Sequence, residues 1–98
     1  MFDFTKIYGN DCFVEDDFDP LGKINIKCPP SDELDALLVG KIDDMIEALL
    51  YDKDKVKFFS DSNKEQLRGV IPYTEKMKLH KIILVANNVI ESEDIKKK

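Results

Sequence analysis

Hydrophobic and polar positions alternate strictly between residues 23 and 28. Ile24, Ile26 and Cys28 fall on one side of this stretch, and Lys23, Asn25 and Lys27 fall on the other. A period of two residues predicts a β-strand with one apolar face. The sequence therefore contains one well-marked strand near its N-terminal end.

A second apolar stretch, Cys12-Phe13-Val14, lies upstream of this strand. Between the two stands Asp19-Pro20-Leu21-Gly22, in which Asp, Pro and Gly occupy the positions that a type I turn favours. We therefore predict a β-hairpin over residues 11–28. Its first strand is the weaker one, because three acidic residues follow Val14 without interruption.

A longer period marks residues 31–51. Apolar side chains recur there at spacings of three and four residues, which is typical of an amphipathic helix. Pro29-Pro30 precedes the segment, Ser31 is a candidate N-cap, and Gly40 lies outside the apolar stripe. The stripe consists of Leu34, Leu37, Leu38, Ile42, Met45, Ile46 and Leu49.

Two short elements are expected next. The composition of residues 55–59 predicts a short strand with aromatic packing through Phe58 and Phe59. Ser62 and Glu65 fit a capping box, which predicts a short helix that ends near Gly69 and before Pro72.

The C-terminal segment admits two interpretations. Leu79, Ile82, Ile83, Ala86 and Ile90 share one helical face, which favours a helix from about residue 74 to about residue 91. The alternative is a strand over 81–86 with a turn at 87–88. With the helix, the pattern predicts one α+β domain over residues 1–98: a hairpin, a central amphipathic helix, a short strand and a C-terminal helix, with a frayed tail at 95–98.

Composition narrows the class of protein. The chain has 98 residues, 43% of them hydrophobic, which suffices for one core. No apolar run approaches the length of a membrane span, and the N-terminal stretch lacks the pattern of a secretory signal. Two cysteines do not make a disulfide framework, so reduced thiols and a cytoplasmic location are expected, and a single bridge between Cys12 and Cys28 is the alternative.

Candidate catalytic chemistry is sparse. His80 is the only histidine, and a nucleophile–base pair would need it beside Cys12 or Cys28, neither of which lies in a nucleophile motif. The same residues lack the paired spacing of a zinc site, and no glycine-rich loop could hold a phosphate. We expect no enzyme activity, no cofactor and no metal.

Charge is the most informative feature. Residues 1–54 hold fourteen acidic residues against five lysines, a net of −9, whereas residues 55–98 carry a net of +4. Such asymmetry bears on partners rather than on fold. The acidic half should repel phosphate, so direct nucleic-acid and membrane binding are not expected. A basic protein surface is its natural counterpart.

On a continuous helix over 31–51, six carboxylates lie roughly opposite the apolar stripe, and four more lie in the hairpin. If the two groups adjoin, they form one extended acidic surface that could bind a basic partner through steering and counterion release. The candidate partner-binding residues are Glu15, Asp16, Asp17, Asp19, Asp32, Glu33, Asp35, Asp43, Asp44 and Glu47.

In size and in the acidic residues spread over 11–54, the chain resembles small acidic bacteriophage proteins that mimic DNA. That resemblance implies a non-enzymatic inhibitor, acting in a host cytoplasm on a DNA-binding protein such as a restriction nuclease. The basic half departs from an all-over acidic mimic. The alternative hypothesis is an assembly module, possible as a homodimer, in which the acidic half of one copy meets the basic half of another.

Overall fold

A computed structural model of the protein describes residues 3–4, 6 and 12–90. The N-terminal hairpin is confirmed: strand β1 (Phe13–Phe18) pairs antiparallel with β2 (Gly22–Lys27). The turn contains a cis Asp19–Pro20 peptide bond, which the predicted type I turn did not include, and Gly22 adopts φ 81°. β1 continues through the acidic run, because pairing with β2 satisfies its backbone despite the low strand propensity of Asp and Glu.

A third strand, β3 (Leu50–Asp52), pairs antiparallel with β2 and gives the sheet order β1-β2-β3. The sequence placed this strand at 55–59 instead, and that prediction was wrong. The carboxylate of Asp52 accepts hydrogen bonds from the backbone N–H groups of Asp54 and Val56, and Lys55 takes a positive φ. This tight turn brings the following segment back beside β3, where it forms only an isolated bridge between Tyr51 and Lys57.

The predicted helix over 31–51 is in fact two helices, α2 (Ser31–Val39) and α3 (Ile42–Leu49). The break lies at Gly40, whose extended backbone ends α2. Glycine is unfavourable inside a helix by about 1 kcal/mol relative to alanine, so the chain loses little by breaking there. The break lets α3 bury its apolar side while α2 takes another direction, and it leaves Leu38 and Val39 exposed.

Helix α4 (Gln66–Gly69) is shorter than predicted, and the expected capping box at Ser62 and Glu65 does not form. Asn63 holds the preceding turn instead, because its carboxamide oxygen accepts the backbone N–H of Ser60. Its amide group also donates to the carbonyl of Phe58. The turn that leads into α4 is thus held by Asn63.

The C-terminal helix is confirmed as α5 (Tyr73–Ala86). It ends five residues before the predicted boundary, and Glu91 and the predicted frayed tail at 95–98 lie outside the described residues. Asn88 has φ 62°, the N–H of Val89 donates to the carbonyl of Leu84, and the N–H of Asn88 donates to that of Val85. These two hydrogen bonds form a Schellman motif. Asn87-Asn88 therefore ends a helix and is not the turn after a strand over residues 81–86.

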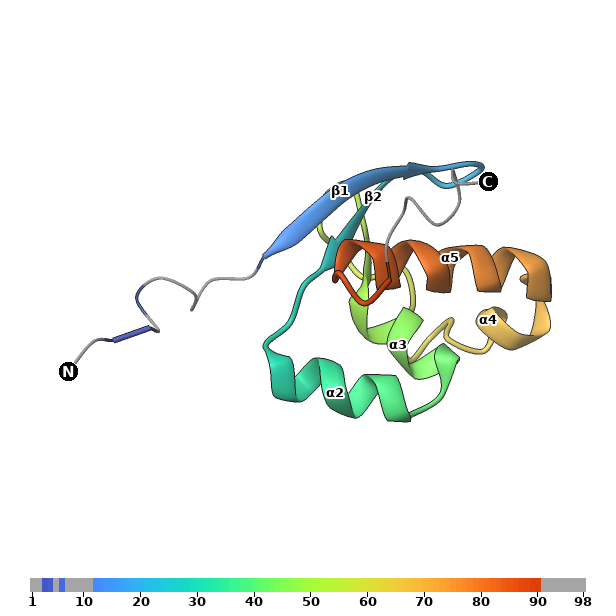
Figure 1. Ribbon diagram of the computed structural model, residues 1–98. Coiled ribbons are helices and arrows are strands. Elements are labelled where there is room, and N and C mark those ends of the chain that lie inside the picture. Colours follow the sequence, from blue (N-terminus) through green and yellow to red (C-terminus); the bar gives the residue numbers. More distant parts are fainter. Residues whose placement is uncertain (1–2, 5, 7–11, 91–98) are drawn as a thin grey trace, which may run out of the picture.

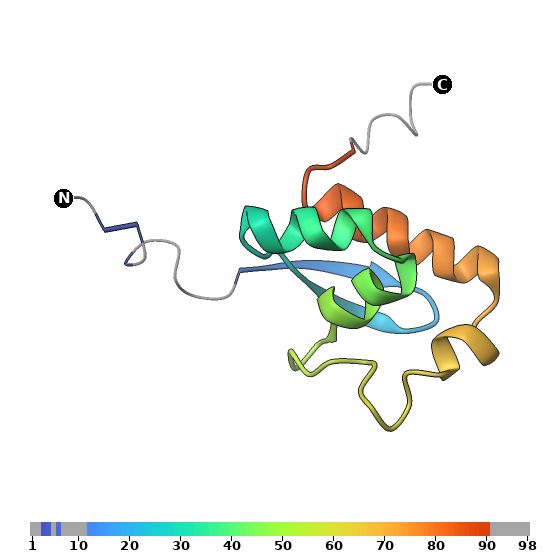
Figure 2. The same ribbon diagram turned by 90° about the horizontal axis from the view of Figure 1, so that it is seen from below.

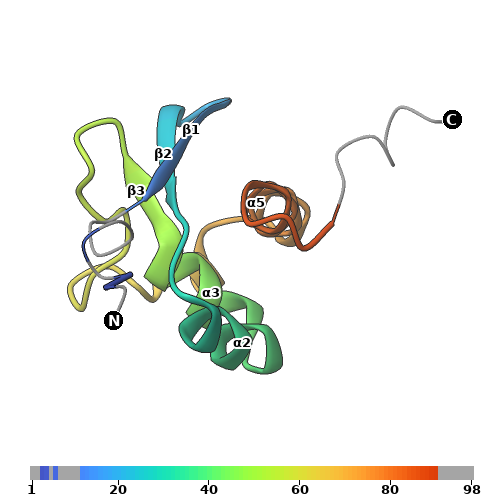
Figure 3. The same cartoon turned by 60° about the vertical axis from the view of Figure 1, so that its left-hand side comes forward.

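One α+β core joins these elements. The sheet lies on one side of the molecule, α5 runs along its inner face, and α3 and then α2 lie beyond (Figures 1 and 3). Helix α3 lies between α5 and α2 in Figures 1 and 3, and the view from below shows α4 at the N-terminal end of α5 (Figure 2). The buried apolar side chains are Phe18, Ile24, Ile26, Met45, Ile46, Leu49, Leu50, Phe59, Leu67, Leu79 and Ile83. Helix α2 contributes no fully buried residue and packs mainly on α3.

Candidate functional site

Three acidic residues of the hairpin lie on an edge strand, and the fourth, Asp19, lies in the turn that follows it. In the described part of the chain β1 pairs only with β2, and Glu15, Asp16, Asp17 and Asp19 are all exposed. Successive side chains of a strand project to opposite faces, so carboxylates stand on both sides of this edge. Lys23, opposite Asp17 in the register, is the one cation paired directly across from them.

One backbone N–H group on the outer edge of β1 is hydrogen-bonded to a carboxylate of the acidic run. The N–H of Cys28 donates to the carbonyl of Cys12 over 2.8 Å, which fixes the alternation of the β1–β2 ladder. In that alternation the backbone groups of Phe13, Glu15 and Asp17 face away from β2. The Asp16 carboxylate accepts the N–H of Asp17 over 2.8 Å. A charged, partly capped edge resists pairing with another strand.

The acidic residues of α2 are exposed and take part in no ion pair within the described chain. Asp32 and Glu33 lie in the first turn, where the helix dipole favours anions, so folding itself gives these two a role. Asp35 lies one turn further along the same helix. On α3, Asp44 is exposed and Glu47 is half-buried.

Asp43 is not on the outer acidic face, and the expectation that it is presented to solvent beside Asp44 and Glu47 was wrong. Only 8% of Asp43 is exposed. Its carboxylate accepts Lys76 Nζ at 2.8 Å and Arg68 Nε at 3.0 Å. The hydrogen bond from Lys76, aided by Arg68 and opposed by burial, holds the pKa of Asp43 below its ordinary value. Asp43 therefore ties α3 to α4 and α5.

The sequence missed this ion-pair cluster because Lys76 and Arg68 belong to α5 and α4, and the sequence does not show that these helices pack beside α3. Asp43 lies one helical turn before the buried Ile46, so it borders the buried side of α3. That three-residue spacing is the signal that could have separated Asp43 from the outer face. The charge asymmetry between the two halves is thus partly neutralised within one molecule.

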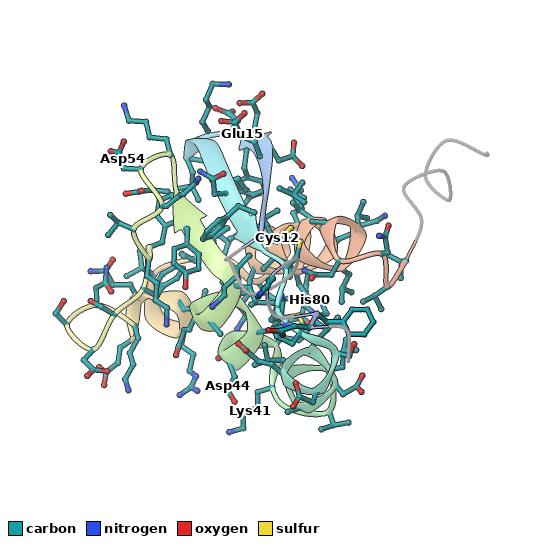
Figure 4. All side chains as sticks on the ribbon, turned by 90° about the vertical axis from the view of Figure 1, so that its left-hand side faces the viewer. Cys12, Glu15, Lys41, Asp44, Asp54 and His80 are labelled. Carbon is teal, nitrogen blue, oxygen red and sulfur yellow. The ribbon has the colours of Figure 1, made fainter. Side chains whose placement is uncertain are left out.

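The two acidic groups do not form one surface. Glu15 lies at the sheet end of the molecule and Asp44 at the opposite end, with the core between them (Figure 4). The expected continuous surface of ten carboxylates is therefore divided. One part, the acidic hairpin, comprises Glu15, Asp16, Asp17 and Asp19, and the other lies on α2 and α3.

The outer side of α3 lines a shallow groove whose opposite wall carries charges of both signs. Two adjoining hollows of about 410 and 540 Å³ lie between α3 and residues 57–69. Asp44 and Glu47 form one wall, and the other is lined by Lys57, Asp61, Lys64, Glu65 and Arg68. The negative charge near Arg68 raises the pKa of its guanidinium, chiefly through Asp43 and to a smaller extent through Glu47 and Asp44. The carboxylates of α3 therefore lie near cations of the same chain.

The candidate catalytic residues do not assemble into a nucleophile–base pair. Among the described residues, no hydrogen bond joins His80 to Cys12 or Cys28. Burial lowers the pKa of His80, and burial together with the nearby Cys12 raises the pKa of Cys28. Neither shift activates a thiolate, which requires a lowered cysteine pKa.

The described part of the chain contains neither a group of metal ligands nor a membrane-spanning helix. No cluster of His, Cys, Asp and Glu there has the arrangement of a metal site. No described helix has the length and apolar character needed to cross a bilayer.

The chain matches no known protein family model, and comparisons with curated proteins and with solved structures find no significant similarity.

Proposed function

We propose that this protein is a non-enzymatic binding protein whose acidic hairpin docks on a basic surface of another protein. The observation that carries the proposal is the exposed run Glu15-Asp16-Asp17 within a six-residue strand, for which the described residues show no ion pair. Asp and Glu are depleted in strands, and like charges so close repel one another. Folding alone does not call for three of them in succession.

Most of the other candidate carboxylates have roles inside the molecule. Asp43 is paired with two cations, Asp44 and Glu47 line a groove that also holds cations, and Asp32 and Glu33 complement a helix dipole. Asp35 is a single exposed carboxylate on α2. Among the described residues, the acidic hairpin has only Lys23 directly across from it, so it is the largest group of carboxylates that remains available for a partner.

This proposal is narrower than mimicry of a DNA duplex. A mimic of that kind needs a continuous row of charge, spaced like phosphates, and the two acidic groups of this chain stand at opposite ends. A compact cluster on one edge fits a local basic segment instead. Steering between opposite charges would speed association and make it depend on salt.

Binding to an extended Lys- and Arg-rich peptide, followed by calorimetry across a salt series, tests the proposal. The test variant is Glu15→Gln with Asp17→Asn, which neutralises two side chains on one face of β1. The matched control is Asp32→Asn with Asp35→Asn, which removes the same charge from α2. We expect the hairpin variant to lose about tenfold or more in affinity, since each close charge pair is worth about 1 kcal/mol or more. The control should keep its affinity.

Equal losses in the two variants would show that only net charge matters and would contradict a dedicated hairpin site. Binding that neither variant alters would contradict the proposal as well. Greater aggregation of the hairpin variant without any change in affinity would assign the carboxylates to protection of the edge strand. Circular dichroism of both variants would establish that each is folded.

The self-association hypothesis requires cations that are available to a second copy, and two of them are already paired within the molecule. Arg68 and Lys76 belong to the basic half, and both already pair with Asp43 of the same molecule. Sedimentation of the wild-type protein at low and high salt remains its test, because charge-driven assembly should weaken as salt increases.

A further inference from the structure

The two cysteines lie directly opposite each other at the open end of the hairpin. The β1–β2 register pairs Phe13 with Lys27, so the next pair outward is Cys12 and Cys28. The N–H of Cys28 donates to the carbonyl of Cys12 over 2.8 Å, which makes them a hydrogen-bonded pair of the antiparallel ladder. Directly opposed side chains project to the same face of the sheet.

The Cα separation of this register suits a disulfide. The Cα atoms of a hydrogen-bonded antiparallel pair lie about 5.5 Å apart, at the commonest Cα separation of protein disulfides. The bond also requires the two Cβ atoms to approach to within about 4.5 Å, which a small twist at this open end of the hairpin would allow. The proximity of Cys12 contributes, after burial, to the raised pKa of Cys28. Both thiols are free in the present structure.

The two sulfurs differ in access. Cys12 is exposed, whereas Cys28 is half-buried and its Sγ donates to the carbonyl of Ala86 at the end of α5, over 3.7 Å. An exposed thiol beside a shielded one is the arrangement of an entry cysteine with a resolving cysteine. The amide of Asn87 also donates to the carbonyl of Lys27, so the end of β2 is attached to the end of α5.

We propose that Cys12 and Cys28 form a reversible cross-strand disulfide that closes the open end of the hairpin in response to oxidants of the low-molecular-weight disulfide class. The Cys12 thiolate attacks one sulfur of the oxidant, forms a mixed disulfide and releases one thiol. Cys28 gives its proton to solvent and attacks the Cys12 sulfur, which releases the second thiol. Two protein thiols are thereby oxidised as one oxidant molecule is reduced to two thiols.

The bond would alter the contacts at the end of α5. Oxidation removes the S–H of Cys28, and with it the donor to the Ala86 carbonyl. It also links the two strands covalently where the hairpin is farthest from its turn. The reduced and oxidised proteins should therefore differ at the hairpin end and at residues 86–87, and not in the core.

The test uses the full 98-residue chain in buffers of reduced and oxidised glutathione, with free thiols trapped by iodoacetamide and read by intact mass spectrometry. The expected product is a monomer that lacks two hydrogen atoms and takes up no alkyl group. The single variants Cys12→Ser and Cys28→Ser should stop at the mixed disulfide with glutathione. Because folding already brings the cysteines together, the equilibrium constant for ring closure should be at least about tenfold greater in the native chain than in urea.

Three results would overturn the proposal. One is a native wild-type protein that keeps two alkylatable thiols or accumulates only mixed disulfide. Another is oxidation that yields disulfide-linked dimers instead of closed monomers. The last is a closure constant in urea equal to the native one, because the folded register would then contribute nothing.

Discussion

Replacement of Asp43 by Asn should remove the largest electrostatic contribution to the stability of this fold. The substitution keeps the side-chain volume and removes the charge between Lys76 and Arg68. The side chains of Asp43 and Lys76 are only 11% and 15% exposed, and their 2.8 Å contact is a charge-assisted hydrogen bond. Bonds of this kind contribute about 1.5–3 kcal/mol. Loss of the carboxylate also leaves a nearly buried ammonium group with only an amide oxygen and the Tyr73 ring in place of its anionic partner.

Arg68 should add little, because its side chain is 68% exposed and solvent screens the pair. We therefore expect Asp43→Asn to lower the free energy of unfolding by about 2–3 kcal/mol, a large part of the roughly 5–15 kcal/mol typical of a small domain. Urea unfolding at neutral pH measures the difference. Asp44→Asn, on the exposed neighbour in the same helix, is the matched control and should change stability by less than about 0.5 kcal/mol.

The pH dependence supplies a second readout. The folded pKa of Asp43 is lowered, so the unfolded chain takes up the proton at a higher pH than the folded chain does. The contribution of the carboxylate is fully present above its unfolded pKa and is lost as the pH falls through the lower, folded pKa. The deficit of Asp43→Asn should thus shrink as acid protonates the wild-type carboxylate. A deficit that is constant across the acid range, or one below about 0.5 kcal/mol at neutral pH, would refute this account of the cluster.

Two further substitutions test the sheet. In Gly22→Ala the new methyl group meets no neighbouring atom, yet φ 81° is unfavourable for any residue with a Cβ, so the substitution should cost about 1 kcal/mol in thermal unfolding. Gly69→Ala, at an equally open but helical position, is the control and should be neutral or stabilising. Equal effects of the two substitutions would contradict this explanation. Asn25 is 5% exposed, and its amide donates to two backbone carbonyls at the end of β3, so Asn25→Ala should cost about 1–3 kcal/mol in urea unfolding. Lys23→Ala, on the exposed neighbour of the same face, should cost much less, and a comparable loss would show that the buried carbonyls do not need the amide.

Elements that are marked by a local pattern of apolar residues could be predicted from the sequence alone. The two-residue period around Ile24 and Ile26 placed β2, and both residues are fully buried. The shared helical face of Leu79 and Ile83 placed α5, and it outweighed the strand-like composition of 81–86. Periodicity of this kind reflects which side of an element faces the core, so it can be read without knowledge of the neighbours.

Tertiary structure decided the features that depend on more than one element. Leu50 and Tyr51 lie within the predicted helix, yet they pair with β2 as a strand, which satisfies their backbone groups at the free edge of β2 and buries Leu50 in the core. Asn25 belongs by pattern to the polar face, but its amide satisfies carbonyls at the end of β3 and is buried.

The charges illustrate the same division. Sequence located a strong negative half and the acidic run of the hairpin, since charge is a property of each residue alone. Only the fold decided that Asp43 turns inward to Lys76 and Arg68 while Glu15 and Asp44 lie at opposite ends. Asp43 borders the buried side of α3, and the packing of α4 and α5 against that helix brings the two cations to it. Electrostatic pairing depends on distance through space, and the order of residues along the chain does not contain that distance.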